Sequence, residues 1–232
     1  MAIHEGHRGR LRKRFQAEGL ENFTEVQVLE LLLFYCIPRK DTNELAHLLL
    51  DRFGSLSHVM DAKIEDLMSV DGIGENAAVF LKLIIEAGRF YSVNKNSHID
   101  ILRSIDECGR FLLPNFDNRV NETVYLLCLD AKCKVLKCQM VGEGSVNSAG
   151  VPIRRVVEMA LAANATTVVL AHNHPSGLAL PSHEDVVTTK LLATALDAVE
   201  ITLADHLVVA DGDYVSMVQS GYYRPNECGL RV

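Results

Sequence analysis

Two different hydrophobic patterns divide the chain. Apolar residues recur at helical spacing from residue 1 to about residue 92, as in VQVLELLLFYC after Thr24 and NELAHLLLDRF after Asp41. From Glu122 onward, short apolar runs of the kind found in strands alternate with helical segments. The pattern therefore predicts an N-terminal helical domain and a C-terminal mixed sheet with flanking helices, which is an α/β (α+β) architecture.

The second pattern gives a sequence of expected elements. They are a helix over 101–113, strands over 123–129 and 134–141, a helix from Pro152 to about Ala163, a strand over 166–171, a helix from Ser182 to about Leu196, and short strands over 201–203, 207–210 and 214–217. The residues before them are polar and lack periodicity. We therefore expect a helical domain over 1–92, a linker over 93–100 and a second domain over 101–232.

Composition excludes several classes of protein. The chain has 232 residues, of which 48% are hydrophobic, and a formal net charge of −7. It shows no apolar run behind basic residues at its start and no stretch approaching the ~18–20 apolar residues of a membrane span. Six cysteines without a CxxC pair favour reduced thiols, and the missing PCxxC argues against a nucleotide deaminase. We expect a cytoplasmic protein with no membrane partner.

Two histidines follow a predicted strand at a spacing that suits a metal ion. His172 and His174 stand two residues apart, and such side chains project to the same side of an extended chain. Asp185 lies one turn into the helix that follows. Two imidazoles, a carboxylate and an open fourth position are a common construction for catalytic Zn²⁺, so the spacing predicts a metal-dependent hydrolase. The alternative is that Ser182 and Asp185 form only a helix-capping pattern.

The same residues carry a resemblance to a known family. HNHPSG with the later Pro181-Ser182 and Asp185 resembles the JAMM (MPN+) metalloprotease motif, whose positions are matched by His172, His174, Ser182 and Asp185. The residues of this motif resemble those of the RadC family. Three further segments also resemble that family, namely HRGRLRKRF, VDGIGENAAVFLK and LADHLVVADGDYVSM, so the resemblance covers nearly the whole chain. It implies a helix-hairpin-helix region before an MPN domain, bound Zn²⁺, and hydrolysis of an undefined peptide-type substrate.

The resemblance also implies a catalytic glutamate upstream of the histidines. Glu122, directly before a predicted strand, has the expected position, and Glu143 after the next strand is the alternative general base. Ser182 could donate a hydrogen bond to the oxyanion of a tetrahedral intermediate, cap the helix, or do both. Asp205-His206 could contact and support the metal ligands or form a buried hydrogen-bonded pair; we favour the pair and leave it out of the metal ligands.

A nucleic-acid role is the competing hypothesis. Gly72-Ile73-Gly74 between two predicted helices resembles a helix-hairpin-helix loop, whose backbone N–H groups can bind a DNA phosphate. Arg12 and Lys13 belong to a basic cluster near the start of the chain that can neutralise phosphates. The acidic flanks of the loop and the net charge of −7 argue against general DNA binding. The alternative function is therefore that of a DNA-associated, repair-related protein with a non-catalytic or structural metal site. If the protein binds neither a metal nor DNA, the third hypothesis is a scaffold protein with an MPN fold.

Overall fold

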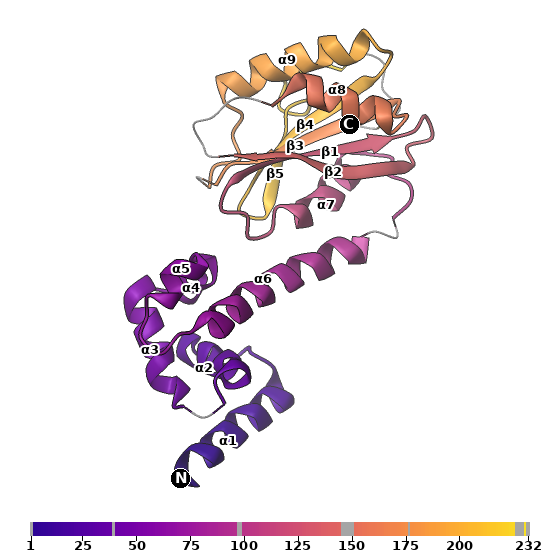
Figure 1. Ribbon diagram of the computed structural model, residues 1–232. Coiled ribbons are helices and arrows are strands. Elements are labelled where there is room, and N and C mark those ends of the chain that lie inside the picture. Colours follow the sequence, from indigo (N-terminus) through magenta and orange to yellow (C-terminus); the bar gives the residue numbers. More distant parts are fainter. Residues whose placement is uncertain are drawn as a thin grey trace. The chain divides into compact units, whose positions relative to one another are not determined.

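The architecture predicted from the hydrophobic pattern is confirmed (Figure 1). The computed structural model describes residues 2–38, 40–96, 99–144, 151–175, 177–225 and 230. It forms two compact units, Met1–Gly88 and Arg89–Val232. The first unit is helical and the second contains a five-stranded sheet with helices on both faces. Among the described residues, no helix combines the length and the apolar composition that crossing a membrane requires.

The first unit is built from helices around a main apolar core and a smaller cluster of Leu11, Leu31 and Phe34. They are α1 (Ala2–Glu18), α2 (Glu25–Cys36), α3 (Thr42–Phe53), α4 (Leu56–Asp61), α5 (Ile64–Met68) and α6 (Glu75–Asn96). The Thr24 side chain accepts a hydrogen bond from the N–H of Gln27, and the Asp41 side chain accepts one from the N–H of Asn43, so both polar residues begin helices. Leu29, Leu49 and Leu81 are fully buried in the core between these helices.

Helix α6 corrects the expected linker. The helix continues to Asn96, so residues 93–96 are helical rather than part of a linker beginning at 93. A polar run needs no apolar periodicity when a helix end is exposed, and the side-chain amide of Asn94 donates to the carbonyl of Phe90 one turn earlier. Residues 97 and 98 lie outside the described residues. The division between the compact units falls within α6, after Gly88.

The sheet of the second unit has the strand order β2-β1-β3-β4-β5. Its strands are β1 (Glu122–Leu129), β2 (Val135–Gly144), β3 (Thr167–Asn173), β4 (Thr202–Ala210) and β5 (Asp213–Ser216). β1 is antiparallel to both β2 and β3, β3 and β4 are parallel, and β5 is antiparallel to β4. The helices are α7 (Ile105–Leu112), η1 (Leu113–Asn115), α8 (Ile153–Ala162) and α9 (His183–Asp197). α8 and α9 cover one face, and α7 covers the other (Figure 1).

Two boundaries differ from the sequence expectation. The strands expected over 201–203 and 207–210 are one strand, β4, because Asp205 and His206 are fully buried and bonded within the sheet rather than placed in a turn. The helix expected from residue 101 begins at Ile105, where the Ser104 hydroxyl caps it. Leu102 instead donates its N–H to the carbonyl of Cys133 beside the sheet.

Alternation along the strands sorts side chains between the two faces. Leu126 and Leu170 belong to the core under α8 and α9, whereas Leu127 and Val169 belong to the core on the α7 side. Each strand therefore sends every second residue to the same layer. His172, two residues after Leu170, lies on the α9 face, which is the face that carries the site described below.

Buried thiols in the second unit remain protonated at neutral pH. Burial raises the pKa of Cys128 to about 11, and burial together with the neighbouring Cys128 raises the pKa of Cys138 to about 12. Within the described residues, the cysteines are thiols and form no disulfide. These observations agree with the reduced, partly buried thiols expected from the sequence; Cys228 lies outside the described residues.

A glycine in α7 allows that helix to pack against β5. A methyl group at Gly109 would overlap the ring of Tyr214, whose hydroxyl donates to Asp106. We expect Gly109→Ala to lower the free energy of unfolding by about 1–3 kcal/mol, since the ring or the helix must move. Urea-induced unfolding followed by circular dichroism measures the loss. Gly88→Ala in the exposed part of α6 is the matched control, because nothing lies within 4 Å of the added methyl; equal stability of the two variants would contradict this packing.

Candidate metal centre

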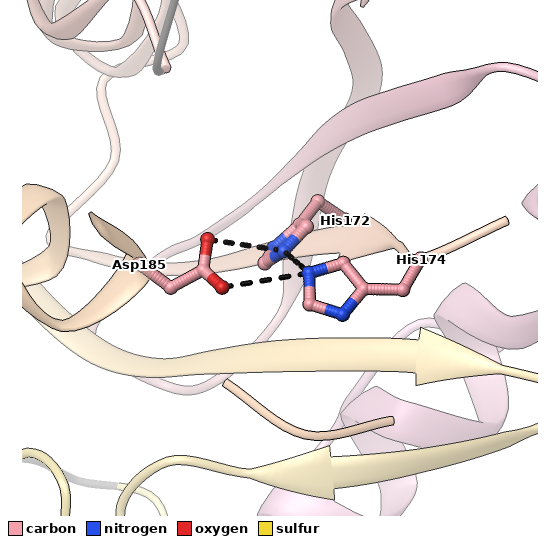
Figure 2. A group of neighbouring side chains, drawn as sticks. All are labelled: His172, His174 and Asp185. Carbon is pink, nitrogen blue, oxygen red and sulfur yellow. Dashed lines mark hydrogen bonds and ion pairs between the residues drawn. The ribbon is translucent and has the colours of Figure 1, made fainter. Parts of the chain in front are cut away.

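Three side chains predicted as metal ligands lie together in the second unit (Figure 2). His172 Nε2 lies 2.9 Å from His174 Nε2 and 3.2 Å from Asp185 Oδ1. His174 Nε2 lies 3.4 Å from Asp185 Oδ2. Ligand atoms bound at 2.0–2.1 Å by a tetrahedral ion lie roughly 3.3–3.4 Å apart. These nitrogen–nitrogen and nitrogen–oxygen distances are close to that spacing, and one ligand atom from each of the three residues lies within 4.8 Å of the others.

The sheet positions the two histidines. His172 ends the pairing of β3 with β1 and is buried, whereas His174 lies just beyond β3 and is partly exposed. The N–H of His174 still donates to the carbonyl of Val209, so this residue continues along β4 in extended form. The chain then turns, with the N–H of Gly177 donating to the carbonyl of His174. Both imidazoles therefore project to the α9 face, as their spacing predicts.

Asp185 is held by a capping box at the start of α9. The Ser182 hydroxyl accepts the N–H of Asp185 at 3.1 Å, and Asp185 Oδ2 accepts the N–H of Ser182 at 2.7 Å. The capping interpretation and the metal-ligand interpretation are thus compatible in one geometry. Burial alone raises the pKa of Asp185, but hydrogen bonds with His172, His174 and Ser182 outweigh it and hold that pKa below its usual range. The carboxylate is therefore ionised and oriented.

Hydrogen bonds outside the cluster fix which nitrogen of each imidazole carries a proton. The second nitrogen of His174, Nδ1, lies 3.1 Å from the carbonyl oxygen of Leu178, which can only accept, so Nδ1 carries the proton. Nε2 of neutral His174 then presents a lone pair to Asp185. This is the arrangement in which a metal-binding histidine donates its other N–H to a carbonyl.

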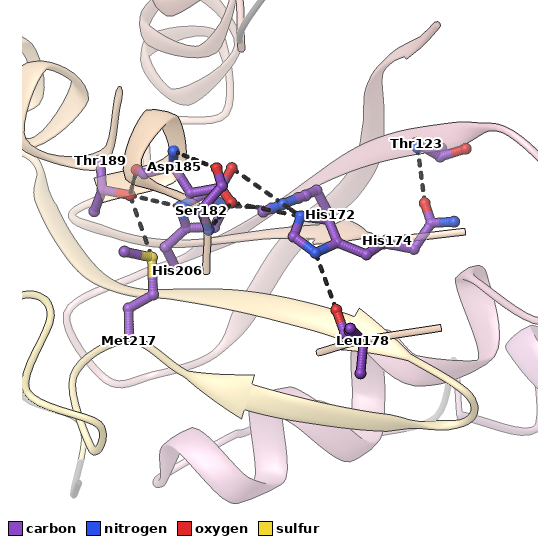
Figure 3. A network of polar contacts seen from close by, with 10 residues as sticks. Thr123, His172, His174, Leu178, Ser182, Asp185, Thr189, His206 and Met217 are labelled. Atoms are coloured by element: carbon purple, nitrogen blue, oxygen red, sulfur yellow. Dashed lines mark hydrogen bonds and ion pairs between the residues drawn. The ribbon is translucent and has the colours of Figure 1, made fainter. Parts of the chain in front are cut away.

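A buried chain of contacts does the same for His172 (Figure 3). His172 Nδ1 lies 2.8 Å from His206 Nε2, and His206 Nδ1 lies 2.6 Å from the hydroxyl of Thr189. That hydroxyl donates to the carbonyl of Asp185 at 2.6 Å. Its oxygen can then accept from His206, and His206 Nε2 can accept from His172. Read in this direction, the chain leaves the lone pair of His172 Nε2 facing the other ligand atoms.

The same chain decides between two alternatives for His206 and contains one residue that the sequence analysis missed. His206 is a buried hydrogen-bonding residue, and it contacts the candidate ligand His172, which was the alternative we did not favour. Burial lowers the pKa of His206 well below its usual value, so it stays neutral. Thr189 carried no signal in the sequence, although its position one helical turn after Asp185 places it on the same face of α9.

The donor set fits a divalent cation. With both imidazoles in these tautomers, two lone pairs and a carboxylate converge. Such acceptors need either a cation or an added proton. Without a metal, the proton is the substitute: the pKa of His174 is raised, mainly by its hydrogen bond to Asp185 and against the effect of burial. Nitrogen and oxygen ligands in this number suit Zn²⁺ with one position open.

The two candidate general bases lie on opposite faces of the sheet. Val124 pairs with His172, so Glu122, two residues earlier, shares the α9 face with the cluster. Its charge also contributes to the raised pKa of His174. Glu143 pairs with Thr123 and so points to the other face, where it contacts Arg119 at 3.6 Å. The geometry favours Glu122 for a role beside the ligands.

A pocket opens beside His174. Its apolar lining includes Leu113, Phe116 and Val209, and its polar lining includes Asp117 and Arg119. Leu113 belongs to η1, Phe116, Asp117 and Arg119 to the segment before β1, and Val209 to the end of β4. Because Leu113, Phe116 and Val209 belong to the core on the α7 side, the pocket lies on that face of the sheet and meets the cluster at the partly exposed His174.

The residues predicted to contact nucleic acid all belong to the first unit. Gly72 has a φ of 89° and would bring an added methyl within 2.6 Å of Leu45, so packing explains this glycine, whereas nothing lies within 4 Å of such a methyl at Gly74. The guanidinium of Arg12 lies over the ring of Tyr35, and Lys13 is exposed. DNA binding at these residues stays a prediction.

The fold and the cluster together define a class of protein. A His-x-His pair at the end of a strand, with an aspartate in the first turn of the next helix, places the second unit among JAB-type domains. The family model described as RadC-like JAB domain matches residues 102–222, and the model described as UPF0758 N-terminal matches residues 5–79. The chain belongs to this RadC (UPF0758) family, as its motifs predict.

Relatives match over nearly their full length. A UPF0758 protein of Fusobacterium nucleatum is 32% identical over 227 residues, which cover 94% of this chain and 97% of the relative. A UPF0758 protein of Aliivibrio fischeri strain MJ11 is 34% identical over 213 residues, covering 92% and 95%. A UPF0758 protein of Ruegeria pomeroyi is 33% identical over 216 residues, covering 93% and 96%. These names give the family and no activity.

Proposed function

We propose that this protein is a zinc-dependent hydrolase that cleaves a peptide-type bond by JAMM-type peptidase or isopeptidase chemistry. The observation that carries the proposal is the convergence of His172 Nε2, His174 Nε2 and the Asp185 carboxylate, a donor set that suits a divalent cation. Membership of a JAB-type family and the partial exposure of His174 support it. His172, His174 and Asp185 would hold the zinc ion, which would supply a Lewis acid able to activate water near neutral pH.

Glu122 is the residue we assign to proton transfer. Its carboxylate accepts the proton of the attacking water and passes it to the amine that leaves, which is the task of a general base and acid. It lies on the face of the ligands, and its charge reaches His174. A carboxylate beside a cation stays ionised and thus ready to accept.

Ser182 has a hydroxyl proton available for catalysis. Its oxygen already accepts the N–H of Asp185, but that contact uses a lone pair and leaves the O–H free to donate. We assign this O–H to the oxyanion that develops on the substrate carbonyl. The same side chain therefore caps α9 and stabilises the transition state.

Substrate cleavage is tested with a peptide library. Zinc-loaded protein is incubated with a mixture of unmodified and lysine-branched peptides, and mass spectrometry identifies new termini. The proposal expects products that vanish after chelation and return with added zinc. A lack of products in every peptide class from protein shown to carry zinc would contradict it.

The buried chain behind His172 gives a further expected result. Thr189→Val retains the shape of the side chain but removes the hydroxyl that holds His206, the residue in contact with His172. We expect zinc affinity to fall by about 10- to 100-fold. Competition with a chromophoric chelator measures it, and Thr188→Val on the same helix is the control. Equal affinities in the two variants would show that the chain does not orient the ligand.

A further inference from the structure

Asn173, between the two histidines, has its side chain buried between β1 and β3. It is 5% exposed, although an amide at the end of a strand is usually solvated. Its Oδ1 accepts the N–H of Thr123 at 2.8 Å, and its Nδ2 donates to the carbonyl of Asn121 at 3.2 Å (Figure 3 shows the contact at Thr123). The amide thus bonds to the backbone on both sides of Glu122.

The side chain replaces backbone pairing at the point where the strands separate. The ladder between β1 and β3 ends at Val124 and His172. Antiparallel pairs keep a constant sum of residue numbers, here 124 + 172 = 296, so continuation would place Asn173 opposite Thr123 and His174 opposite Glu122. The chain instead follows β4, where the N–H of His174 donates to Val209. The Asn173 amide spans the gap that results.

We propose that Asn173 is a positioning residue that holds Glu122 beside the metal ligands. The assignment rests on the proposed function, since it concerns the placement of the general base. Glu122 and Thr123, the first residues of β1, lie before the point where β1 pairs with β3. The two hydrogen bonds of the Asn173 amide connect this part of β1 to β3. Asn173 is not a ligand, since its neighbours on either side face the α9 side and it faces away from them.

Acetohydroxamic acid tests this placement without the natural substrate. It binds zinc through two oxygens and gives up a proton, which a correctly placed carboxylate accepts. Calorimetry at one pH compares full-length, zinc-loaded wild type, Glu122→Gln, Asn173→Ala and the double variant. Asn121→Ala is the matched control, because its side chain contacts Glu143 and its backbone carbonyl, the acceptor for Asn173, is retained. Zinc affinity of each variant is measured in parallel.

We expect Glu122→Gln to weaken hydroxamate binding by about 10- to 100-fold, the loss typical of one hydrogen bond to a charged group. Asn173→Ala weakens it in the same direction with zinc affinity retained, the double variant is no weaker than Glu122→Gln, and Asn121→Ala binds as wild type. Asn173→Ser serves as the second variant if the alanine protein does not fold.

Other outcomes overturn the proposal in distinguishable ways. Wild-type binding by Asn173→Ala, or losses that add in the double variant, would refute the role of Asn173 and leave the general base in place. Wild-type binding by Glu122→Gln would remove the assignment of Glu122 itself and, with it, the role of Asn173. Lost zinc in Asn173→Ala would make the residue a support of the ligands instead.

Discussion

Glu122→Gln is expected to lower the rate of peptide-bond hydrolysis by about 100- to 10,000-fold, the usual contribution of a general base. Glutamine has the size of glutamate but cannot accept a proton at neutral pH. The side chain is not among the three converging ligand atoms, so zinc content stays unchanged. The rate of product formation from a cleaved library peptide, at equal zinc occupancy, measures the effect.

Glu143→Gln is the matched control for this variant. Glu143 lies on the opposite face of the sheet, where Arg119 and the side chain of Asn121 bind it. We expect the rate of Glu143→Gln to equal that of wild type. A large loss in Glu143→Gln with none in Glu122→Gln would reverse the assignment and indicate that the strand parity does not describe the active protein.

Asp205→Ala should produce the largest loss of stability among the substitutions considered. Asp205 is fully buried, and its carboxylate accepts the N–H groups of His206 and Val218 and the hydroxyl of Ser216. Alanine leaves these donors without a partner inside the protein, and each costs about 1–3 kcal/mol. We therefore expect a loss of about 3–5 kcal/mol in the free energy of unfolding, measured in urea. A loss under about 1 kcal/mol would contradict this account of the contacts.

The Asp205 carboxyl should also make the free energy of unfolding depend on pH. Burial raises the pKa of Asp205 to about 6, although hydrogen bonds from Ser216 and the backbone lower it. In the unfolded chain this carboxyl has a pKa of about 3.9, so between about pH 4 and pH 6 the native state binds more protons than the unfolded state. Its contribution to the free energy of unfolding therefore rises as pH falls through that window. Asp205→Asn lacks this titration, and the difference between the two proteins should change with pH accordingly.

The sequence predicted the ligands because their positions are local. His172 and His174 share a face because side chains on a strand alternate with a period of two residues. Asp185 lies in the first turn of the helix that follows. Glu122 and Glu143 could not be separated in this way, since only the register of β1 against β2 and β3 shows which face each occupies. Contacts of Asn173 with residues about fifty positions earlier are likewise a property of the register.

Polar residues in buried strands account for the main errors in the predicted elements. Asp205-His206 interrupts an apolar run, so the pattern predicts two short strands, but each side chain has a hydrogen-bond partner inside the unit and β4 continues through the pair. The polar end of α6 was interpreted as a linker for the opposite reason, because an exposed helix needs no apolar face. Both errors arise where partners or solvent, rather than periodicity, decide the structure.

The central claim is the metal site, and the metal content of the purified protein tests it most directly. Untagged wild-type protein and His174→Ala are analysed by inductively coupled plasma mass spectrometry after zinc is supplied and excess zinc is removed. The account predicts about one zinc per chain in wild type and loss of that zinc in the variant, because a ligand is removed from a partly exposed position. Absence of zinc from both proteins, with the fold intact, would contradict the metal site and the hydrolase proposed from it.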